Sequence, residues 1–419
     1  MRRPRRPRAK TPRTPDRVTA EDSPATRRAY ALFLCALASW FCAQSMQSVT
    51  YQWLLTRSLA LPPGSVGLAQ MSAMLPSLFF LLIGGMTADR GDRRRMLGRF
   101  HIAQAAVFAA LAFAIAAGYL QFETLLGFAL ALGTLQAFAI PARDAQISDV
   151  VAGDMSRAVA GMNVTQQGAQ AVGAIVAGAA NPLGVPAVVG LQACVVLVGA
   201  LAVARLPRTD ARRHETAPRA SLAELRAGVV EVLRSPVLRP VFLVIALLGL
   251  FFVGPFVVLL PLLVRESYGG SAIRLGVINA MVPLGGILTG LWIVRRGGIG
   301  RKGKALLIGN ASAAACVALL ALRPPFALAA LLVFGWGVGA SFVMTSARTL
   351  FQEHASVSNR ARVLSVFSLG ILGAGPLASL LSGALSRAVG THAALGIEGC
   401  ASLVIIGLTA AGSRIRSLR

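Results

Sequence analysis

Residues 84–97 read GGMTADRGDRRRML, a short charged stretch between two long apolar runs. The runs on either side, residues 65–87 and 97–119, are each long enough for a helix that crosses the hydrocarbon core of a bilayer. A charged turn at the point where one such run ends and the next begins is typical of a loop at a membrane surface. The same alternation recurs along the chain, so we predict an all-α membrane protein.

Twelve candidate transmembrane helices can be delimited from this alternation. They cover residues 30–55, 65–87, 97–119, 124–142, 157–180, 184–205, 239–264, 272–294, 305–322, 326–346, 362–385 and 391–412. We expect a disordered basic cytoplasmic tail at 1–29, an N-terminal six-helix bundle at 30–206, a cytoplasmic middle loop at 207–238, a C-terminal six-helix bundle at 239–412 and a cytoplasmic tail at 413–419.

The composition agrees with a membrane protein and argues against a nucleic-acid-binding one. Of the 419 residues, 55% are hydrophobic and 14% are charged, with a formal net charge of +25. The basic residues lie in the gaps between apolar runs and form no folded basic face, so we expect no nucleic-acid partner. The five cysteines are scattered through the apolar runs and the four histidines form no cluster, so we expect neither a metal nor a cofactor.

The distribution of basic residues predicts the orientation in the membrane. With an even number of spans both termini lie on one side, and that side carries 36 of the 41 lysines and arginines. The other side keeps Arg57, Arg265, Arg274, Arg323 and Arg387. Because basic loops are retained in the cytoplasm, we expect both termini there. The Ala-, Gly- and Arg-rich composition indicates a GC-rich bacterial genome, and hence a bacterial inner membrane.

The two halves of the chain repeat each other. When residues 141–180 are shifted by 205 positions, Gly178 falls on Gly383. When the glycine pair 84–85 is shifted by 201 positions, it falls on the pair 285–286, where an apolar run again ends and basic residues follow. A parallel duplication of six spans is an architecture of transporters whose site lies between the halves.

Two six-span halves joined by a middle loop, with GGMTADRGDRRR after the second span, resemble the major facilitator superfamily. The loop motif of that family is G-x-x-x-D-R-x-G-R-R, and Asp92 stands where the family usually has glycine; the matching residues are Gly85, Asp89, Arg90, Arg93 and Arg94. The loop motif with Asp at position 92 resembles the enterobactin-exporter-like branch of bacterial efflux proteins. Two further stretches share this resemblance: PARDAQISDVV after span 4 and NRARVLSVFSLGILGAGPLASLLSGAL in span 11. The resemblance implies two pseudo-symmetric six-helix bundles that work by alternating access.

Asp89 is a candidate latch between the halves. Span 11 begins near Arg362, just after Ser358 and Asn359, which are candidate N-caps. A carboxylate beside a helix N-terminus is stabilised by roughly 0.3–1 kcal/mol. The resemblance implies that this latch is made in the outward-open state and broken in the inward-open state.

The remaining gate candidates are basic or acidic residues on the same side. Two interpretations apply to the arginines of the loop motif, Arg90, Arg93 and Arg94. In the first they neutralise Asp89 or bind anionic lipid, and in the second they only fix the topology of the chain in the membrane. Arg143 and Asp144 lie at the inner end of span 4, and Arg348 is the counterpart of Arg143 in the second half.

Span 5 carries four amide side chains, Asn163, Gln166, Gln167 and Gln170, which we call the amide stripe. Their spacing of i, i+3, i+4 and i+7 places them on one face of a helix. Four amides facing lipid are very unfavourable, so the stripe either lines a substrate cavity or joins helices by hydrogen bonds.

The resemblance adds further substrate-binding candidates, because spans 1, 4, 7 and 10 line the cavity of the family. These are Gln44, Gln47, Gln136 and Trp336. Span 7 offers only apolar and aromatic surface. Amides that face apolar walls suit a large, mixed-polarity or aromatic substrate better than a sugar or an inorganic ion.

Glu398 in span 12 is the one acid well inside an apolar run, so it is a candidate proton carrier. The alternative is a neutral carboxylic acid that is hydrogen-bonded to a neighbour. His101, in span 3, is interpreted as structural.

Together these features predict a proton-coupled antiporter that exports a small organic molecule, such as a drug, a siderophore or another metabolite. Its partners are the substrate, protons and membrane lipids, and we expect a monomer. An importer of the same fold and a non-transporting membrane sensor or receptor are the alternatives. An enzyme is not expected, because the spans contain no histidine cluster or paired acids.

Overall fold

A computed structural model describes residues 24–90, 93–150, 155–207, 222–356 and 360–418, and every regular element in these ranges is a helix. An all-helical chain is what a bilayer requires, because a helix satisfies its own backbone hydrogen bonds where no water is present. Most of the predicted N-terminal tail, much of the predicted middle loop and the candidate caps Ser358 and Asn359 lie outside the described residues; residues 24–29, which were expected to belong to the tail, already form the start of a helix.

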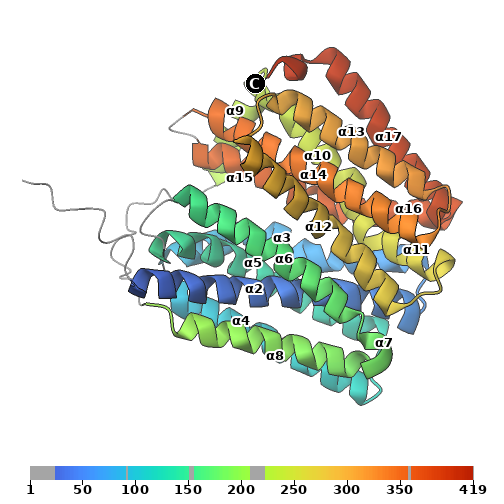
Figure 1. Cartoon of the computed structure of the whole chain (residues 1–419). Helices are drawn as coiled ribbons and strands as arrows, with labels where there is room; N and C mark the ends of the chain where they lie inside the picture. Colours follow the sequence, from blue (N-terminus) through green and yellow to red (C-terminus); the bar gives the residue numbers. More distant parts are fainter. Residues whose placement is uncertain (1–23, 91–92, 151–154, 208–221, 357–359, 419) are drawn as a thin grey trace, which may run out of the picture.

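The helices form two bundles (Figure 1). The N-terminal bundle consists of α2 (Pro24–Trp53) with the π-helical turn η1 (Leu54–Ser58), α3 (Pro63–Arg90), α4 (Arg93–Ala116), α5 (Phe122–Val150), α6 (Met155–Ala177), α7 (Ala180–Leu183) and α8 (Val185–Ala204). The C-terminal bundle consists of α9 (Leu222–Arg234), α10 (Leu238–Gly254), the π-helical turn η3 (Pro255–Leu259), α11 (Leu260–Ser267), α12 (Ala272–Arg296), α13 (Lys302–Leu320), α14 (Phe326–His354), α15 (Arg360–Leu372), α16 (Ala374–Val389), α17 (Thr391–Gly412) and the short 3-10 helix η4 (Arg414–Ser417).

Successive long helices run in opposite directions, so the molecule has two ends. We call the end that carries the start of α2 and the end of α17 the terminal side, and the opposite end the far side. In Figure 1 the terminal side is on the left and the far side is on the right.

Ten of the described helices are long and apolar enough to cross a membrane. The prediction of an all-α, multi-pass membrane protein is therefore confirmed, whereas the count of twelve spans stays a prediction. The two long helices outside this set are α3, which packs against α5, and α6, which packs against α2. The four amides of α6 lower its hydropathy, which explains why a helix inside a bundle is less apolar than its neighbours.

The two π-helical turns support the internal duplication. Residues 54–58 and 255–259 are both π-helical, and a shift of 201 places one on the other. This shift is the same one that aligns the glycine pairs 84–85 and 285–286 in the sequence. A π-helical turn widens a helix by one residue, and here it occurs at equivalent places in the first span of each half.

The structure differs from the sequence-based expectation by two additional helices and one longer helix. The predicted middle loop contains α9, whose apolar residues recur at helical spacing and whose Gly228 packs against the backbone of Arg362 in α15. The predicted C-terminal tail contains η4, which packs against α13 and buries Ile415. Helix α5 continues to Val150, so Arg143 and Asp144 belong to its last turns and not to a loop.

Candidate functional site

The amide stripe lies on α6, which packs against α2 of its own bundle and against α12 of the other. Gln167 contacts α12 at Gly286, where an added Cβ would overlap with the Gln167 Nε2 atom. Gln166 and Gln170 are half-buried, and Asn163 is exposed. At Gln167 the stripe therefore faces the C-terminal bundle, and the amide lies directly against the backbone of α12 at Gly286.

The predicted amides of spans 1 and 4 meet each other. The Gln44 Nε2 group of α2 donates a hydrogen bond to Gln136 Oε1 of α5, with a distance of 3.1 Å. The Ser45 hydroxyl donates to the Gln170 carbonyl at 2.7 Å, so α2 also holds the stripe helix in place. Gln47 is half-buried, and its Oε1 atom accepts no hydrogen bond within the described part of the chain. Such an acceptor, buried without a hydrogen-bond partner, is uncommon in a folded protein.

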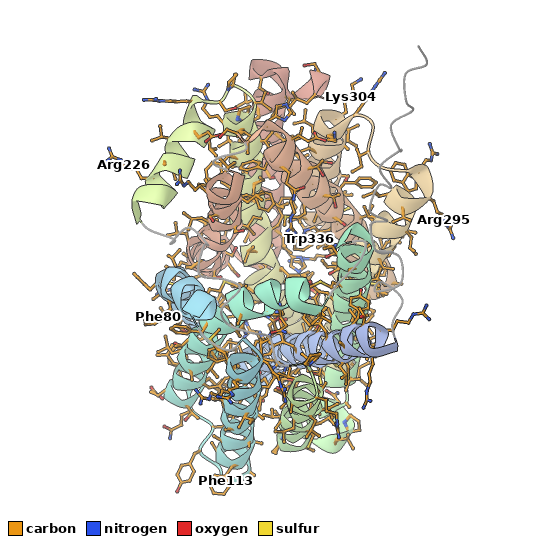
Figure 2. All side chains as sticks on the ribbon, turned by 90° about the vertical axis from the view of Figure 1, so that its left-hand side faces the viewer. Phe80, Phe113, Arg226, Arg295, Lys304 and Trp336 are labelled. Atoms are coloured by element: carbon orange, nitrogen blue, oxygen red, sulfur yellow. The ribbon has the colours of Figure 1, made fainter. Side chains whose placement is uncertain are left out.

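An aromatic cluster in the C-terminal bundle surrounds Trp336. The Trp336 ring centroid lies 5.7 Å from that of Phe252 and 6.1 Å from that of Phe256, and the second pair is perpendicular. Only 3% of the Trp336 surface is exposed. Figure 2 shows Trp336 near the boundary between the bundles. Neutral amides on one bundle and aromatic surface on the other provide hydrogen bonds together with a flat apolar contact.

Hydrogen bonds join the two bundles in the far-side half of the molecule. Trp53 Nε1 donates to the Gly270 carbonyl at 3.1 Å, and Arg265 Nη1 donates to the Leu61 carbonyl at 2.8 Å. The Ala272 amide donates to Asn181 Oδ1 at 2.9 Å, and Asn279 Nδ2 donates to Gln52 Oε1 at 3.1 Å. We call these four bonds the far-side clasp.

Two glycine-lined contacts bring the bundles together near the same end. Between α3 and α16, a Cβ added at Gly67 would lie 2.6 Å from the Ser379 carbonyl oxygen, and one added at Gly383 would lie 3.0 Å from Gly67 Cα. Between α6 and α12, a Cβ added at Gly178 would lie 3.0 Å from Ile273 Cα. Gly178 and Gly383 are the pair that the 205-residue shift aligns, so the two contacts are related by the duplication.

The clasp gives a testable expectation for Arg265. Replacing it with glutamine removes the charged donor to the Leu61 carbonyl, and a hydrogen bond to a charged group contributes about 1.5–3 kcal/mol. The far side should therefore open more often, and a cysteine placed at the buried Ala272 should react about 10- to 150-fold faster with a membrane-impermeant thiol reagent.

Arg274 offers a matched control for this measurement. Its guanidinium donates to the Tyr268 carbonyl at 2.6 Å, which lies in its own bundle. Arg274→Gln should leave the reaction rate of the Ala272 cysteine unchanged. Equal rates in the Arg265→Gln variant and in the unsubstituted background would show that the clasp does not hold the bundles together.

Glu398 lies inside the C-terminal bundle, in contact with α16. It is 1% exposed, and the Ser382 hydroxyl lies 2.8 Å and 3.1 Å from its two carboxylate oxygens. No described basic residue forms a salt bridge with it. Burial without a countercharge favours the protonated, neutral carboxyl.

A short series of hydroxyl groups connects the region around Glu398 to the far side. Thr391 Oγ1 donates to Glu266 Oε1 at 3.0 Å, and it lies 3.1 Å from the Ser386 hydroxyl. Ser382 is one helical turn further along α16, about 6 Å in rise. Titratable or charged groups around α17 include His392 on α17 itself, Arg265 and Arg323 at the far side, Arg387 on α16, and Cys316, Lys302 and Lys304 on α13.

The gate candidates on the terminal side fall into two sets. The side chains of Asp89, Arg90, Arg93 and Asp144 lie outside the described residues, so the latch stays a prediction. Arg94 donates to the Ala204 carbonyl at the end of α8 and thereby binds a free helix C-terminus in its own bundle.

Arg143 and Arg348 differ in their surroundings although the duplication relates them. The Arg143 guanidinium lies 4.7 Å above the ring of Phe41, which is a cation–π contact. Arg348 is exposed on α14.

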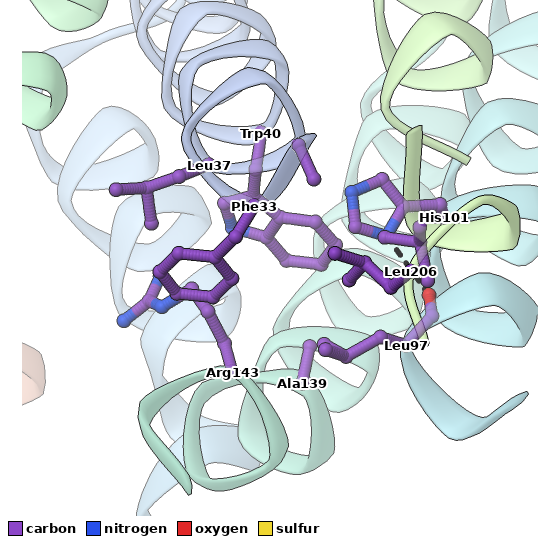
Figure 3. A pocket seen from close by; sticks show the side chains of 10 residues that line it. Phe33, Leu37, Trp40, Leu97, His101, Ala139, Arg143 and Leu206 are labelled. Carbon is purple, nitrogen blue, oxygen red and sulfur yellow. Dashed lines mark hydrogen bonds between the residues drawn. The ribbon is translucent and has the colours of Figure 1, made fainter. Parts of the chain in front are cut away.

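A small apolar pocket beside Arg143 is lined by Phe33, Trp40 and His101 (Figure 3). Its volume of about 10 Å³ is enough for at most one water molecule. His101 is 3% exposed, its Nδ1 lies 2.8 Å from the Leu97 carbonyl, and its ring packs edge-on against Trp40. This pocket therefore packs the bundle, and it is not a ligand site.

Sequence reasoning missed the far-side clasp. Gln52 and Asn279 could be recognised as polar residues in apolar runs, but nothing in the sequence pairs them across 227 positions. A weak indication was available, because Arg57 and Arg265 lie on the side that otherwise excludes basic residues. Among the described residues, no group of histidine, cysteine, aspartate or glutamate side chains is placed to hold a metal ion.

The chain belongs to the Major Facilitator Superfamily, whose family model matches residues 32–370. It is a membrane transporter and not an enzyme. No curated protein sequence matches the chain.

Several solved transporter structures share the fold. The nucleoside transporter NupG is similar with a TM-score of 0.72 and 15% sequence identity, over 93% of this chain and 99% of that chain. A bacterial homologue of the human lysosomal transporter Spinster, in an inward-facing and unoccupied conformation, has a TM-score of 0.66 and 17% identity, over 93% and 96%. A POT family transporter in complex with 5-aminolevulinic acid has a TM-score of 0.70 and 14% identity, over 92% and 96%. At these identities the likeness shows the fold alone.

Proposed function

We propose that this transporter exports a small organic molecule of mixed polarity across a bacterial inner membrane by alternating access. The observation that carries the proposal is the amide stripe, which at Gln167 faces the C-terminal bundle, the bundle that also holds the Trp336 cluster. The amides supply hydrogen-bond donors and acceptors without charge, and the aromatic rings supply a flat apolar surface. A drug, a siderophore or a similar metabolite has both kinds of surface.

The residues proposed to contact the substrate lie on both bundles. Those of the N-terminal bundle are Gln44, Gln47, Gln136, Asn163, Gln166, Gln167 and Gln170, and Trp336 belongs to the C-terminal bundle. A site shared by two bundles is exposed to one side at a time as the bundles rock. The half-buried amides support this role, because a ligand can reach them without unfolding a helix.

We infer that the structure represents the state closed on the far side. The clasp and the two glycine contacts all hold the bundles together near that end. With both termini in the cytoplasm, as the distribution of basic residues favours, this state is the inward-facing one. The likeness to the Spinster homologue in its inward-facing conformation supports the same assignment.

Export as the direction is supported by the motifs that resemble the enterobactin-exporter-like branch, chiefly GGMTADRGDRRR and PARDAQISDVV. Proton antiport is supported by Glu398, the buried acid with a hydroxyl neighbour and without a countercharge. We propose that the protein works as a monomer and that Asp89, with Arg90, Arg93, Arg94, Arg143, Asp144 and Arg348, forms the terminal-side gate.

The proposal is tested by a drug and siderophore sensitivity panel in a strain that lacks the gene. The unsubstituted protein should restore resistance to at least one compound. Gln167→Ala should weaken that resistance about two- to tenfold, because a neutral hydrogen bond contributes about 0.5–1.5 kcal/mol. Asp89→Asn should slow transport while leaving membrane insertion intact.

The control for Gln167→Ala is Gln121→Ala, which removes the same group from an exposed position before α5. Inverted membrane vesicles then establish the direction: an exporter accumulates the compound under an imposed pH gradient, and an importer depletes it. Resistance that Gln167→Ala leaves unchanged for every transported compound would exclude the stripe as the substrate site.

A further inference from the structure

A groove of about 390 Å³ opens on the outer surface of the C-terminal bundle, between α13 and α17. Its walls are apolar and include Leu307, Ile308 and Ala311 of α13 and Leu403, Ile406 and Gly407 of α17. Ile308 is 68% exposed, and a Cβ added at Gly407 would meet no atom within 4 Å. The groove is therefore open toward the space that the lipid acyl chains occupy.

Two basic side chains, Lys304 and Arg416, lie at the terminal-side end of this groove. Both are exposed, and neither forms an ion pair or a hydrogen bond in the part of the chain that the structure describes. Lys302 differs, because it forms a salt bridge with Glu353 at 2.7 Å. Figure 2 shows Lys304 at the rim of the C-terminal bundle, on the side away from the N-terminal bundle.

The groove has a basic end and an apolar length, as a phospholipid has a charged headgroup and an apolar acyl chain. From Lys304 to Ala311 the helix rises by about 10 Å, so the groove leads from charge at the membrane surface into the hydrocarbon region. Burial of an acyl chain along apolar walls is favourable, and each basic residue near the surface attracts an anionic headgroup.

We propose that this groove binds one anionic phospholipid, with its phosphate at Lys304 and Arg416 and one acyl chain between α13 and α17. A second copy of the chain fits less well, because a symmetric contact would bring the same two unpaired cations of each copy together. The site is separate from the amide stripe, so it does not depend on the proposed substrate.

Native mass spectrometry of the purified full chain tests this proposal. The protein is equilibrated with phosphatidylglycerol or phosphatidylcholine of identical acyl chains, and the bound lipid is counted. The unsubstituted protein should retain phosphatidylglycerol preferentially. In the double variant Lys304→Gln, Arg416→Gln this preference should fall by about 30-fold. Each basic residue near the membrane surface raises the affinity for an anionic lipid by about fivefold, so two residues multiply to about this factor.

Two further variants separate charge from shape. Gly407→Leu fills the groove without changing the charge, and it should reduce the retention of both lipids. The double variant Arg295→Gln, Arg296→Gln removes two exposed basic residues from the terminal end of α12, and it should bind phosphatidylglycerol as the unsubstituted protein does. If Gly407→Leu does not fold, the comparison between the two double charge variants still tests whether Lys304 and Arg416 bind the headgroup.

Three outcomes would overturn the proposal. The first is unchanged phosphatidylglycerol retention after loss of Lys304 and Arg416, and the second is equal retention of both lipids by the unsubstituted protein. The third is a dimer mass that Gly407→Leu abolishes, which would assign the groove to a second copy. Inorganic phosphate at millimolar concentration should not displace the bound lipid, because it lacks the acyl chain.

Discussion

Replacing Glu398 with glutamine is expected to abolish transport driven by a pH gradient while substrate still exchanges down its own gradient. The substitution keeps the shape of the side chain and the acceptor for the Ser382 hydroxyl, which lies 2.8 Å away. It removes the one described acid that is both buried in the C-terminal bundle and without a salt bridge. Gradient-driven flux should fall to about the level of vesicles without the protein, because among the described residues Glu398 is the buried acid that could exchange the proton.

The measurement compares two assays on reconstituted vesicles, efflux under an imposed pH gradient and counterflow at equal pH. Glu123→Gln is the matched control, because Glu123 is an exposed acid in the first turn of α5 and should behave as the unsubstituted protein in both assays. Gradient-driven transport that survives Glu398→Gln would leave this acid with a purely structural role. Loss of activity in both assays would indicate a packing defect. Ser382→Ala, which keeps the Glu398 carboxyl, would then show whether the carboxyl carries the proton, because gradient-driven transport should persist in this variant.

Replacing Gly383 with leucine is expected to shift the equilibrium away from the state that is closed on the far side. A Cβ at this position would lie 2.8 Å from the Pro63 carbonyl oxygen and 3.0 Å from Gly67 Cα, so α3 and α16 would have to separate. Overpacking of this kind costs about 1–3 kcal/mol, which shifts a two-state equilibrium by about 5- to 150-fold. Transport should slow, because alternating access needs both states and the closed one becomes less populated.

Spin labels measure the shift directly. Leu183 and Val389 are exposed on the far side of different bundles, and cysteines at these positions report the separation of the bundles once the five native cysteines are replaced by serine. Gly383→Leu should lengthen the distance. Gly190→Leu is the control, because a Cβ added at Gly190 in α8 meets no atom within 4 Å. An unchanged distance distribution in the Gly383 variant would show that this contact does not limit closure.

Hydropathy predicted most of the fold. Apolar runs of membrane length predict the helices because a bilayer leaves the backbone no alternative, and ten of them are confirmed as candidate spans. Helix ends were harder to predict. The helix α9 and the extension of α5 to Val150 depend on packing at the membrane surface, where water satisfies the backbone equally well and hydropathy does not decide.

The candidate site was predicted only where side chains share one helix. The amide stripe follows from the spacing of Asn163, Gln166, Gln167 and Gln170 along α6, because helical periodicity is a local property. The bond from Gln44 to Gln136 joins two helices that are 92 residues apart, and no local pattern pairs them. Arg94 shows the same limit, since its contact with the Ala204 carbonyl depends on how α4 and α8 pack.

The sequence by itself determined that this chain is a helical, multi-pass membrane protein, because hydropathy is a local property of the chain. The tertiary structure alone decided which polar groups face each other across the bundles, namely Trp53 with Gly270, Arg265 with Leu61 and Gln52 with Asn279. The physical reason is that a hydrogen bond acts over about 3 Å, and only the packing of whole helices brings such distant residues within that range.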